Sequence, residues 1–234
     1  MFPTAIEYTT LEGKESLKGF YAKGEKLLIR RIINRQDRIM VSFGDAEMIF
    51  TKDANPFVVT DQEYDTKYLL AVLASKLISY LYVNGSSIAT KDDFRQTTFA
   101  ELRAIPIKKI SAAQQKPFIS KADEMLKCNK ALYDRSSKFL ALLKSELALE
   151  KVGGKLEQWY TLDFAAFTAE PKKRRIDLSL AQKAEWMEYF DEEKNAAVTL
   201  RSRIDITDHE IDQLVYKLYG LTPAEIAVVT AHSV

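Results

Sequence analysis

The stretch from residue 99 to residue 150 constrains the fold most, because it predicts one long helix in the middle of the 234-residue chain. Ser111 and Gln114 have the spacing of a capping box, whose two side chains satisfy exposed donors of the first helical turn. From Ile119 onward, residues suited to a helix interface recur in alternating steps of three and four, a repeat of about 3.5 residues. They are Ile119, Ala122, Leu126, Asn129, Tyr133, Ser136, Leu140, Leu143 and Leu147. This narrow seam predicts lengthwise packing on a second helix, as in a coiled coil.

Local signals set the expected limits and register of this helix. Pro117 falls in the second turn and predicts either a kink there or a later helix start. Asn129 and Ser136 lie on the seam, where a polar residue more often fixes the register than adds stability. Gly153-Gly154 predicts the C-terminal end. We therefore expect a spacer helix over residues 111–152.

A second long helix is the expected partner of the first. Its seam residues are Trp186, Phe190, Ala197, Leu200 and Ile204. We expect Asp208 to cap a third helix that runs to Tyr219. Thr222 and Glu225 form another capping box, with Pro223 at the first position of a short final helix.

Residues before the long helix predict a small domain of short strands and one buried helix. Strands are expected at residues 25–33, 38–43, 47–51 and 57–60, with an edge strand at 102–107. Asp65 is the expected cap of the buried helix at 68–82. The predicted fold class is α+β, with an N-terminal mixed α/β domain, a long-helix pair and a small C-terminal helical region. The expected domains are residues 1–110, the spacer helix at 111–152, and a C-terminal helical region at 153–234 that packs on the spacer.

Composition favours a globular protein of a reducing compartment. Hydrophobic residues make up 47% and charged residues 29% of the chain, which is ordinary for a soluble domain. A single cysteine excludes an internal disulfide, and no apolar signal segment follows Met1, so we expect a cytoplasmic protein. The most apolar run, residues 68–83, carries Lys76 at its centre. A buried helix is therefore expected there, and no membrane association.

The sequence contains few of the patterns that active sites require. None of the eight glycines forms a G-x-G or phosphate-cradling loop. His209 and His232 are the only histidines, and their spacing from Cys128 does not fit a metal site. Asn55-Pro56-Phe57 partly matches the loop by which amino-methyltransferases hold a target amine, but it lacks the second proline and predicts a turn instead. We expect no catalytic, cofactor-binding or metal site in this chain.

Basic residues gather between Lys14 and Arg38, where eight basic and three acidic residues give a net charge of +5. Such a surface suits contacts to nucleic-acid phosphates, and an arginine fork can bind guanine in the major groove. Because neighbouring strand residues point to opposite faces, at most one of Arg30 and Arg31 is expected to reach a ligand through that strand. The candidate DNA-binding residues are Lys23, Lys26, Arg30, Arg31, Arg35, Arg38, Lys91, Arg95, Lys108 and Lys109. The alternative is a solvated basic face without a partner.

Four segments together resemble one family. They are KLLIRRI at 26–32, YLLAVLASKLISYLY at 68–82, LRAIPIKKISAAQQKPFI at 102–119 and IDQLVYKLYGLTPAEIAVV at 211–229. Their order and spacing resemble the C-terminal target-recognition, or specificity, region of N6-adenine DNA methyltransferases in type IIG-like restriction–modification enzymes.

The resemblance implies that the α+β part recognises a short sequence in double-stranded DNA. It implies a methyltransferase domain as partner, in the same polypeptide or as a separate subunit. The chain is then expected to be a fragment or specificity part that is not an enzyme by itself. S-adenosylmethionine, and Mg²⁺ where a nuclease is present, are implied only for the catalytic domains. Base-reading residues vary with the target in this family, so no individual base contact is carried over.

A second function class remains open from the sequence. The long helices could form a protein–protein interaction module that docks a partner through the seam and binds no nucleic acid. That function requires an exposed apolar seam. DNA target recognition does not require this, because the apolar seams of the two long helices can then be buried against each other.

Overall fold

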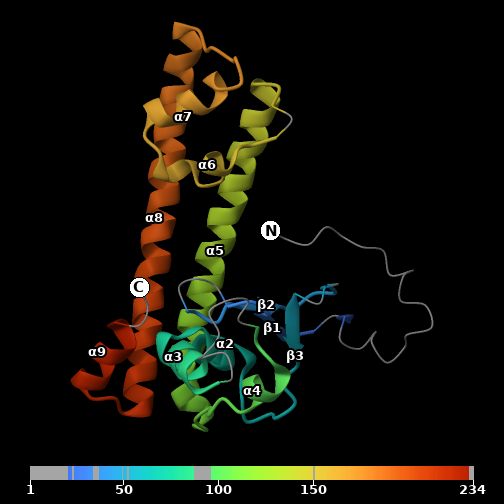
Figure 1. Cartoon of the computed structure of the whole chain (residues 1–234), viewed down its shortest axis with the longest axis vertical. Helices are drawn as coiled ribbons and strands as arrows, with labels where there is room; N and C mark the ends of the chain where they lie inside the picture. Colours follow the sequence, from blue (N-terminus) through green and yellow to red (C-terminus); the bar gives the residue numbers. More distant parts are fainter. Residues whose placement is uncertain are drawn as a thin grey trace, which may run out of the picture. The chain divides into compact units, whose positions relative to one another are not determined.

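The computed structural model describes residues 21–22, 24–33, 37–48, 50–51, 53–86, 96–149 and 151–231. Its strands and helices are drawn in Figure 1. They form two compact units: unit 1 comprises Met1–Asp123 and Asp208–Val234, and unit 2 comprises Glu124–Thr207. The small sheet of unit 1 and the long helices confirm the α+β fold class.

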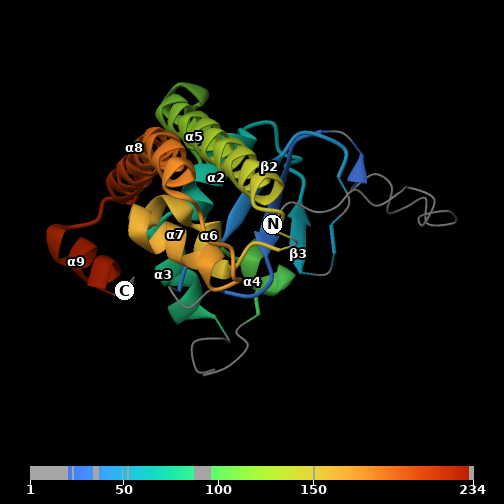
Figure 2. The same ribbon diagram turned by 90° about the horizontal axis from the view of Figure 1, so that it is seen from above.

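Unit 1 contains a three-stranded antiparallel sheet with its first strand in the centre. The strands are β1 (Lys26–Arg30), β2 (Val41–Gly44) and β3 (Ala54–Phe57), in the spatial order β2-β1-β3. Ile29 pairs with Val41 on one side and with Asn55 on the other. Leu27 and Ile29 are buried, and α2 (Thr66–Ala74) packs on β1 and β2. Figure 2 shows the same elements from above.

The sequence predicted the central strand better than the edge strands. The described residues of the expected strand at 47–51 form none. Instead, β3 lies at residues 54–57, earlier than the expected strand at 57–60, and includes Pro56. Proline is compatible with this position because β3 is an edge strand, where one row of backbone groups needs no sheet partner.

The expected single helix at 68–82 is two helices, α2 and α3 (Lys76–Gly85), bent by 66° at Ser75. Asp65 caps α2 as predicted, because its side chain accepts a hydrogen bond from the Lys67 amide. The Ser75 side chain caps α3 by accepting from the Ile78 amide. Among the described residues, no single helix is long and apolar enough to cross a membrane; α2 and α3 meet that criterion only as a bent pair. Most of their apolar side chains are buried inside unit 1.

The expected edge strand at 102–107 is wrong. The structure has a short helix, α4 (Phe99–Arg103), capped by Thr98, followed by a segment without regular structure. The Thr98 hydroxyl accepts from the Glu101 amide at 3.3 Å and donates to the Glu101 carboxylate at 2.7 Å. This short-range signal outweighs the strand propensity of the apolar run that follows.

The long helix α5 (Ala112–Glu146) starts at the predicted capping box. The Ser111 amide donates to Gln114 at 3.0 Å, and Pro117 lies inside the helix rather than before its start. The predicted seam is correct at Ala122 and Leu143, but Tyr133 is 43% exposed. The buried positions between them are Leu132 and Phe139, one residue earlier than Tyr133 and Leu140.

The second long helix, α8 (Leu180–Tyr219), passes through Asp208 without a break. The expected third helix with an Asp208 cap is therefore wrong. The predicted seam is confirmed at Trp186, Phe190, Ala197 and Ile204, which are buried. After α8, Thr222 and Glu225 form the predicted capping box at the start of α9 (Pro223–Ala231).

Unit 2 is held by an aromatic core between α5 and α8. It also contains α6 (Gly154–Glu157), a 3-10 helix at Trp159–Thr161, and α7 (Phe164–Lys172). Phe139 of α5 stacks on Trp159 with ring centroids 3.7 Å apart. Phe190 of α8 stacks on Phe167 of α7 at 4.7 Å. All four rings are fully buried, so the segment between the two long helices, through Trp159 and Phe167, joins α5 to α8 within this unit.

The two long helices end in the same backbone motif with different residues. At the end of α5, Ala148 has φ 47°, and the Leu149 amide donates to the Lys144 carbonyl at 3.0 Å. At the end of α8, Gly220 has φ 73°. Glycine adopts this left-handed conformation without a Cβ clash, whereas alanine is strained there. Helix α5 therefore ends before the predicted Gly153-Gly154.

We predict that Ala148→Gly stabilises the chain by about 1 kcal/mol, because it relieves the left-handed strain. The matched variant Gly220→Ala should destabilise it by a similar amount. Urea denaturation of both variants measures the difference. If Ala148→Gly were destabilising, the left-handed helix end would be contradicted.

Candidate nucleic-acid interface

The structure describes six of the ten basic residues that the sequence selected. Lys23, Arg35, Lys91 and Arg95 lie outside the described residues. The other six divide into residues whose cationic groups bind other parts of unit 1 and residues whose side chains have no such partner among the described residues.

Lys26 belongs to the first group. Its side chain is buried in the sheet, and Nζ donates to the carbonyl oxygens of Ala22, Gly24 and Ala46 at 2.7, 3.0 and 3.1 Å. An ammonium carries three donors, and all three are satisfied here. Lys26 therefore joins the start of β1 to the segment after β2 and has no donor left for a phosphate.

Lys108 and Lys109 also have partners inside unit 1. Lys108 Nζ donates to the Leu218 carbonyl at 2.8 Å, which places a cation at the negative C-terminal end of α8. Tyr68 donates its hydroxyl to the Lys108 carbonyl at 2.5 Å, and burial raises the pKa of Tyr68 to about 12. Lys109 forms an ion pair with Glu63 at the surface. The Lys108-Lys109 segment thus holds α2 and the end of α8 together.

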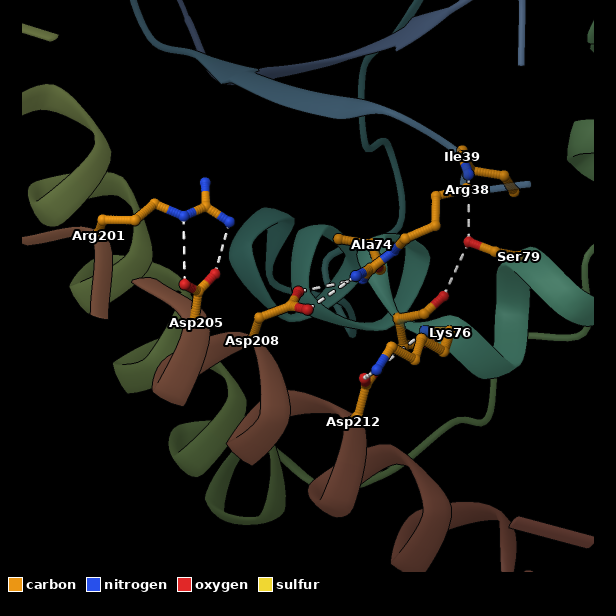
Figure 3. Close-up of polar contacts among 10 residues, drawn as sticks. Arg38, Ile39, Ala74, Lys76, Ser79, Arg201, Asp205, Asp208 and Asp212 are labelled. Carbon is orange, nitrogen blue, oxygen red and sulfur yellow. Dashed lines mark hydrogen bonds and ion pairs between the residues drawn. The ribbon is translucent and has the colours of Figure 1, made fainter. Parts of the chain in front are cut away.

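Arg38 joins three distant segments of unit 1, as Figure 3 shows. Its guanidinium donates to both carboxylate oxygens of Asp208, at 2.7 and 3.0 Å. It also donates to the Ala74 carbonyl, at 2.5 Å, at the end of α2. Two parallel bonds to one carboxylate are the strongest arrangement that arginine makes. Asp208 therefore acts as a partner of Arg38 in the middle of α8 and not as a helix cap.

One turn further along α8, Asp212 binds the start of α3. Its carboxylate accepts from the Lys76 amide at 2.8 Å and lies 3.5 Å from Lys76 Nζ. Asp212 is 1% exposed, and burial raises the pKa of its carboxyl although the Lys76 amide and Arg38 favour the charged form. A carboxylate at a helix N-terminus is favourable because it satisfies exposed amides. Sequence analysis missed this cap because 136 residues separate the two groups.

Arg30 and Arg31 form the second group, which we call the β1 arginine pair. Arg30 is exposed and Arg31 is partly exposed, and neither side chain has a hydrogen-bond or ion-pair partner among the described residues. They lie at the end of β1 and just beyond it, so the pleat directs them to opposite faces. Of the six described candidates, these two are available to a ligand.

The backbone under the β1 arginine pair is hydrogen-bonded at every group. The Arg30 amide donates to Met40 at 2.9 Å, and the Arg31 amide donates to Asp53 at 2.8 Å. The Arg31 carbonyl accepts from the Thr97 amide at 2.6 Å. The Arg30 carbonyl accepts from the Thr97 hydroxyl at 3.3 Å. These bonds fix the backbone of both arginines, so binding a ligand costs them side-chain entropy but little backbone entropy.

Thr97 is itself held by Asn55 of β3. The buried Asn55 side chain donates to the Thr97 hydroxyl at 2.8 Å. Asn55-Pro56-Phe57 is therefore part of an edge strand that supports the arginine pair, and not the turn that the sequence predicted. Among the described residues, no group of three or more His, Cys, Asp or Glu side chains could hold a metal ion.

Comparison with known proteins adds independent findings. Residues 5–107 match the family model of the TaqI-like C-terminal specificity domain, and residues 111–215 match that of a domain of unknown function (DUF8810). A segment of 103 residues is 48% identical to a Methanocaldococcus jannaschii protein that is predicted to be a type II restriction enzyme and methyltransferase. This segment covers 44% of the present chain and 9% of that protein. No solved structure matches the chain.

These findings confirm the resemblance to a specificity region of restriction–modification enzymes. The matched specificity domain includes the sheet, the β1 arginine pair and its Thr97 support. Helix α5 and most of α8 fall within the second matched region. The chain spans only a small part of the length of the relative that it matches.

We predict that Arg38→Ala lowers the free energy of unfolding by about 3 kcal/mol, because it leaves the Asp208 carboxylate and the Ala74 carbonyl without their partner. A double-mutant cycle with Asp208→Ala, followed by urea denaturation, measures the coupling. The control is the cycle of Arg201 and Asp205, an exposed pair four residues apart on α8 that Figure 3 also shows. That pair should couple by only about 0.5 kcal/mol. Equal coupling in both cycles would contradict the proposed role of Arg38.

Proposed function

We propose that this chain recognises a short sequence in double-stranded DNA for a restriction–modification methyltransferase. The single observation that carries the proposal is the match of residues 5–107 to a specificity domain. The β1 arginine pair gives that match a physical basis, because two arginines stand on a fully hydrogen-bonded backbone without internal partners among the described residues. Arginine is the side chain best suited to bind guanine and phosphate.

In this proposal one residue of the β1 arginine pair, Arg30 or Arg31, contacts DNA through the strand, and the other described basic candidates support the fold. Arg38, Lys26 and Lys108 bind carboxylates or carbonyls inside unit 1. Removing one of them would disturb the domain rather than a single DNA contact. Arg30 and Arg31, in contrast, can be changed without removing a side-chain hydrogen bond to any described residue.

We further propose that the reaction served by this recognition is N6-adenine methylation. The support is the resemblance of four segments to adenine-specific enzymes and the similarity to a protein that is predicted to be both a restriction enzyme and a methyltransferase. The proposed partner is a methyltransferase domain, which would bind S-adenosylmethionine. The specificity chain would contribute the choice of target and no catalytic group.

The structure favours this proposal over a module that docks a protein through its seam. Within unit 2, Phe139 and Leu143 of α5 are buried in one core with Phe190 and Ala197 of α8. The seam residues of the two helices are thus buried against one another. A protein partner would have to displace this core or bind another face.

We predict that Arg30→Gln/Arg31→Gln weakens binding to duplex DNA and makes its salt dependence shallower. Each lost phosphate contact should reduce the slope of log affinity against log salt by about 0.9. If one arginine contacts a base, the preference between cognate and random DNA should also fall by about 1–3 kcal/mol. Fluorescence anisotropy at several salt concentrations measures both effects.

The matched control is Arg103→Gln/Lys116→Gln, which removes the same charge from exposed positions of unit 1. This variant should bind DNA nearly as the parent chain does. Equal losses in the two variants would show that only net charge matters and would contradict a localised interface.

We predict that a parent methyltransferase domain transfers methyl groups to adenine at one defined sequence only when this chain is supplied with it. Tritium transfer from S-adenosylmethionine to a set of duplexes, followed by nucleoside analysis, measures site and base. Methylation of cytosine would contradict the adenine proposal. Equal site choice without this chain would contradict its role in recognition.

A further inference from the structure

A second basic surface lies in unit 2, outside the matched specificity domain. It is formed by Lys172, Lys173, Arg174 and Arg175, which we call the basic loop, and by the segment 151–155. The two segments contain six basic residues and no acidic residue. All six basic side chains are exposed.

The structure brings the two segments together at the end of unit 2 where α5 ends and α8 begins. The Arg174 guanidinium donates to the Lys151 carbonyl. A Cβ placed on Gly153 would lie 3.8 Å from Arg174 and 3.9 Å from the Glu170 carboxylate. The two segments therefore touch through Arg174.

Two of the four residues of the basic loop make contacts within unit 2. Arg174 holds the 151–155 segment, and Lys173 pairs with Glu170 at 2.6 Å. Lys172 and Arg175 have no side-chain partner among the described residues, and the same holds for Lys151 and Lys155. Four exposed cationic side chains of this surface therefore have no hydrogen bond or ion pair with another described side chain.

Arg175 has a left-handed backbone conformation, which favours glycine. Its φ is 63°, and the Arg175 and Ile176 amides close the end of α7 on the Lys172 and Pro171 carbonyls at 2.9 and 3.2 Å. A left-handed residue at such a helix end costs free energy unless it is glycine. A strained arginine with no internal partner among the described residues points to a use for its charge.

We propose that the basic loop binds the phosphate backbone of duplex DNA without reading its sequence. This inference rests on the proposed function for the identity of the ligand, but it assigns a different surface with a different role. The β1 arginine pair would discriminate among sequences, and the basic loop would add affinity to any sequence. A cluster of lysines and arginines without an aromatic or apolar pocket suits phosphates and offers nothing to distinguish bases.

The test uses the full chain with Lys172→Gln/Arg175→Gly. Neither side chain has an internal partner among the described residues, and glycine relieves the strain at position 175, so thermal unfolding should not occur at a lower temperature. Affinity for random duplex DNA at low salt should fall about tenfold, and the log–log salt slope should become shallower by up to about 1.8. The ratio of cognate to random affinity should stay unchanged.

Two control variants locate the effect. Lys127→Gln/Lys138→Gln removes two exposed charges from α5 in the same unit and should have little effect. Lys172→Arg/Arg175→Lys retains the charge and should bind as the parent chain does. If the α5 variant loses as much affinity as the loop variant, or if the loop variant loses none, the basic loop is not a DNA-binding surface.

The outcomes separate this inference from the proposed function. DNA binding that depends on Arg30 and Arg31 but not on the basic loop would overturn the inference alone. Binding that depends on the basic loop but shows no sequence preference would support the inference and contradict target recognition. If the parent chain binds no duplex DNA at low salt, both are wrong.

Discussion

The guanidinium of Arg38 is the interaction on which unit 1 depends most. It joins the segment before β2 to the end of α2 and to Asp208 of α8. One turn along α8, Asp212 accepts from the Lys76 amide at the start of α3. Arg38, which is paired with Asp208, donates to the Ala74 carbonyl on the other side of the Ser75 bend. The bend exposes a carbonyl of α2, which accepts from Arg38, and an amide of α3, which donates to Asp212 of α8. A C-terminal helix segment thereby completes a domain whose sheet lies near the N-terminus.

This use of charge decides which basic residues remain for a ligand. Lys26, Arg38 and Lys108 donate to carbonyls or carboxylates inside unit 1, whereas Arg30 and Arg31 stand on a backbone whose four polar groups are all paired. The sequence presents all of them as one basic cluster. The structure separates them by hydrogen bonding and burial, and the family comparison gives the exposed pair a biological context.

Signals that act within a few residues could be predicted from the sequence, and contacts across the chain could not. Ser111 with Gln114, Thr222 with Glu225, and Asp65 were correct helix caps because their partners lie in the same turn. Asp208 has the same cap preference, but Arg38, 170 residues away, uses its carboxylate. The predicted seam of α5 was one residue out of phase at Tyr133, because Leu132 and Phe139 are the buried residues and Phe139 packs on Trp159 and on Trp186 of α8. The β1 arginines were selected by charge, but their Thr97 support depends on a contact across 67 residues.

The most direct test of the account is selection of bound sequences from a library of randomised duplex DNA, using the purified chain at moderate salt. Specific recognition typically exceeds non-specific binding by about 10³-fold or more, which such a selection detects readily. The account predicts enrichment of one short sequence, and loss of that enrichment in Arg30→Gln/Arg31→Gln. Retention of DNA with no enriched sequence, by the chain alone and together with its methyltransferase domain, would contradict target recognition.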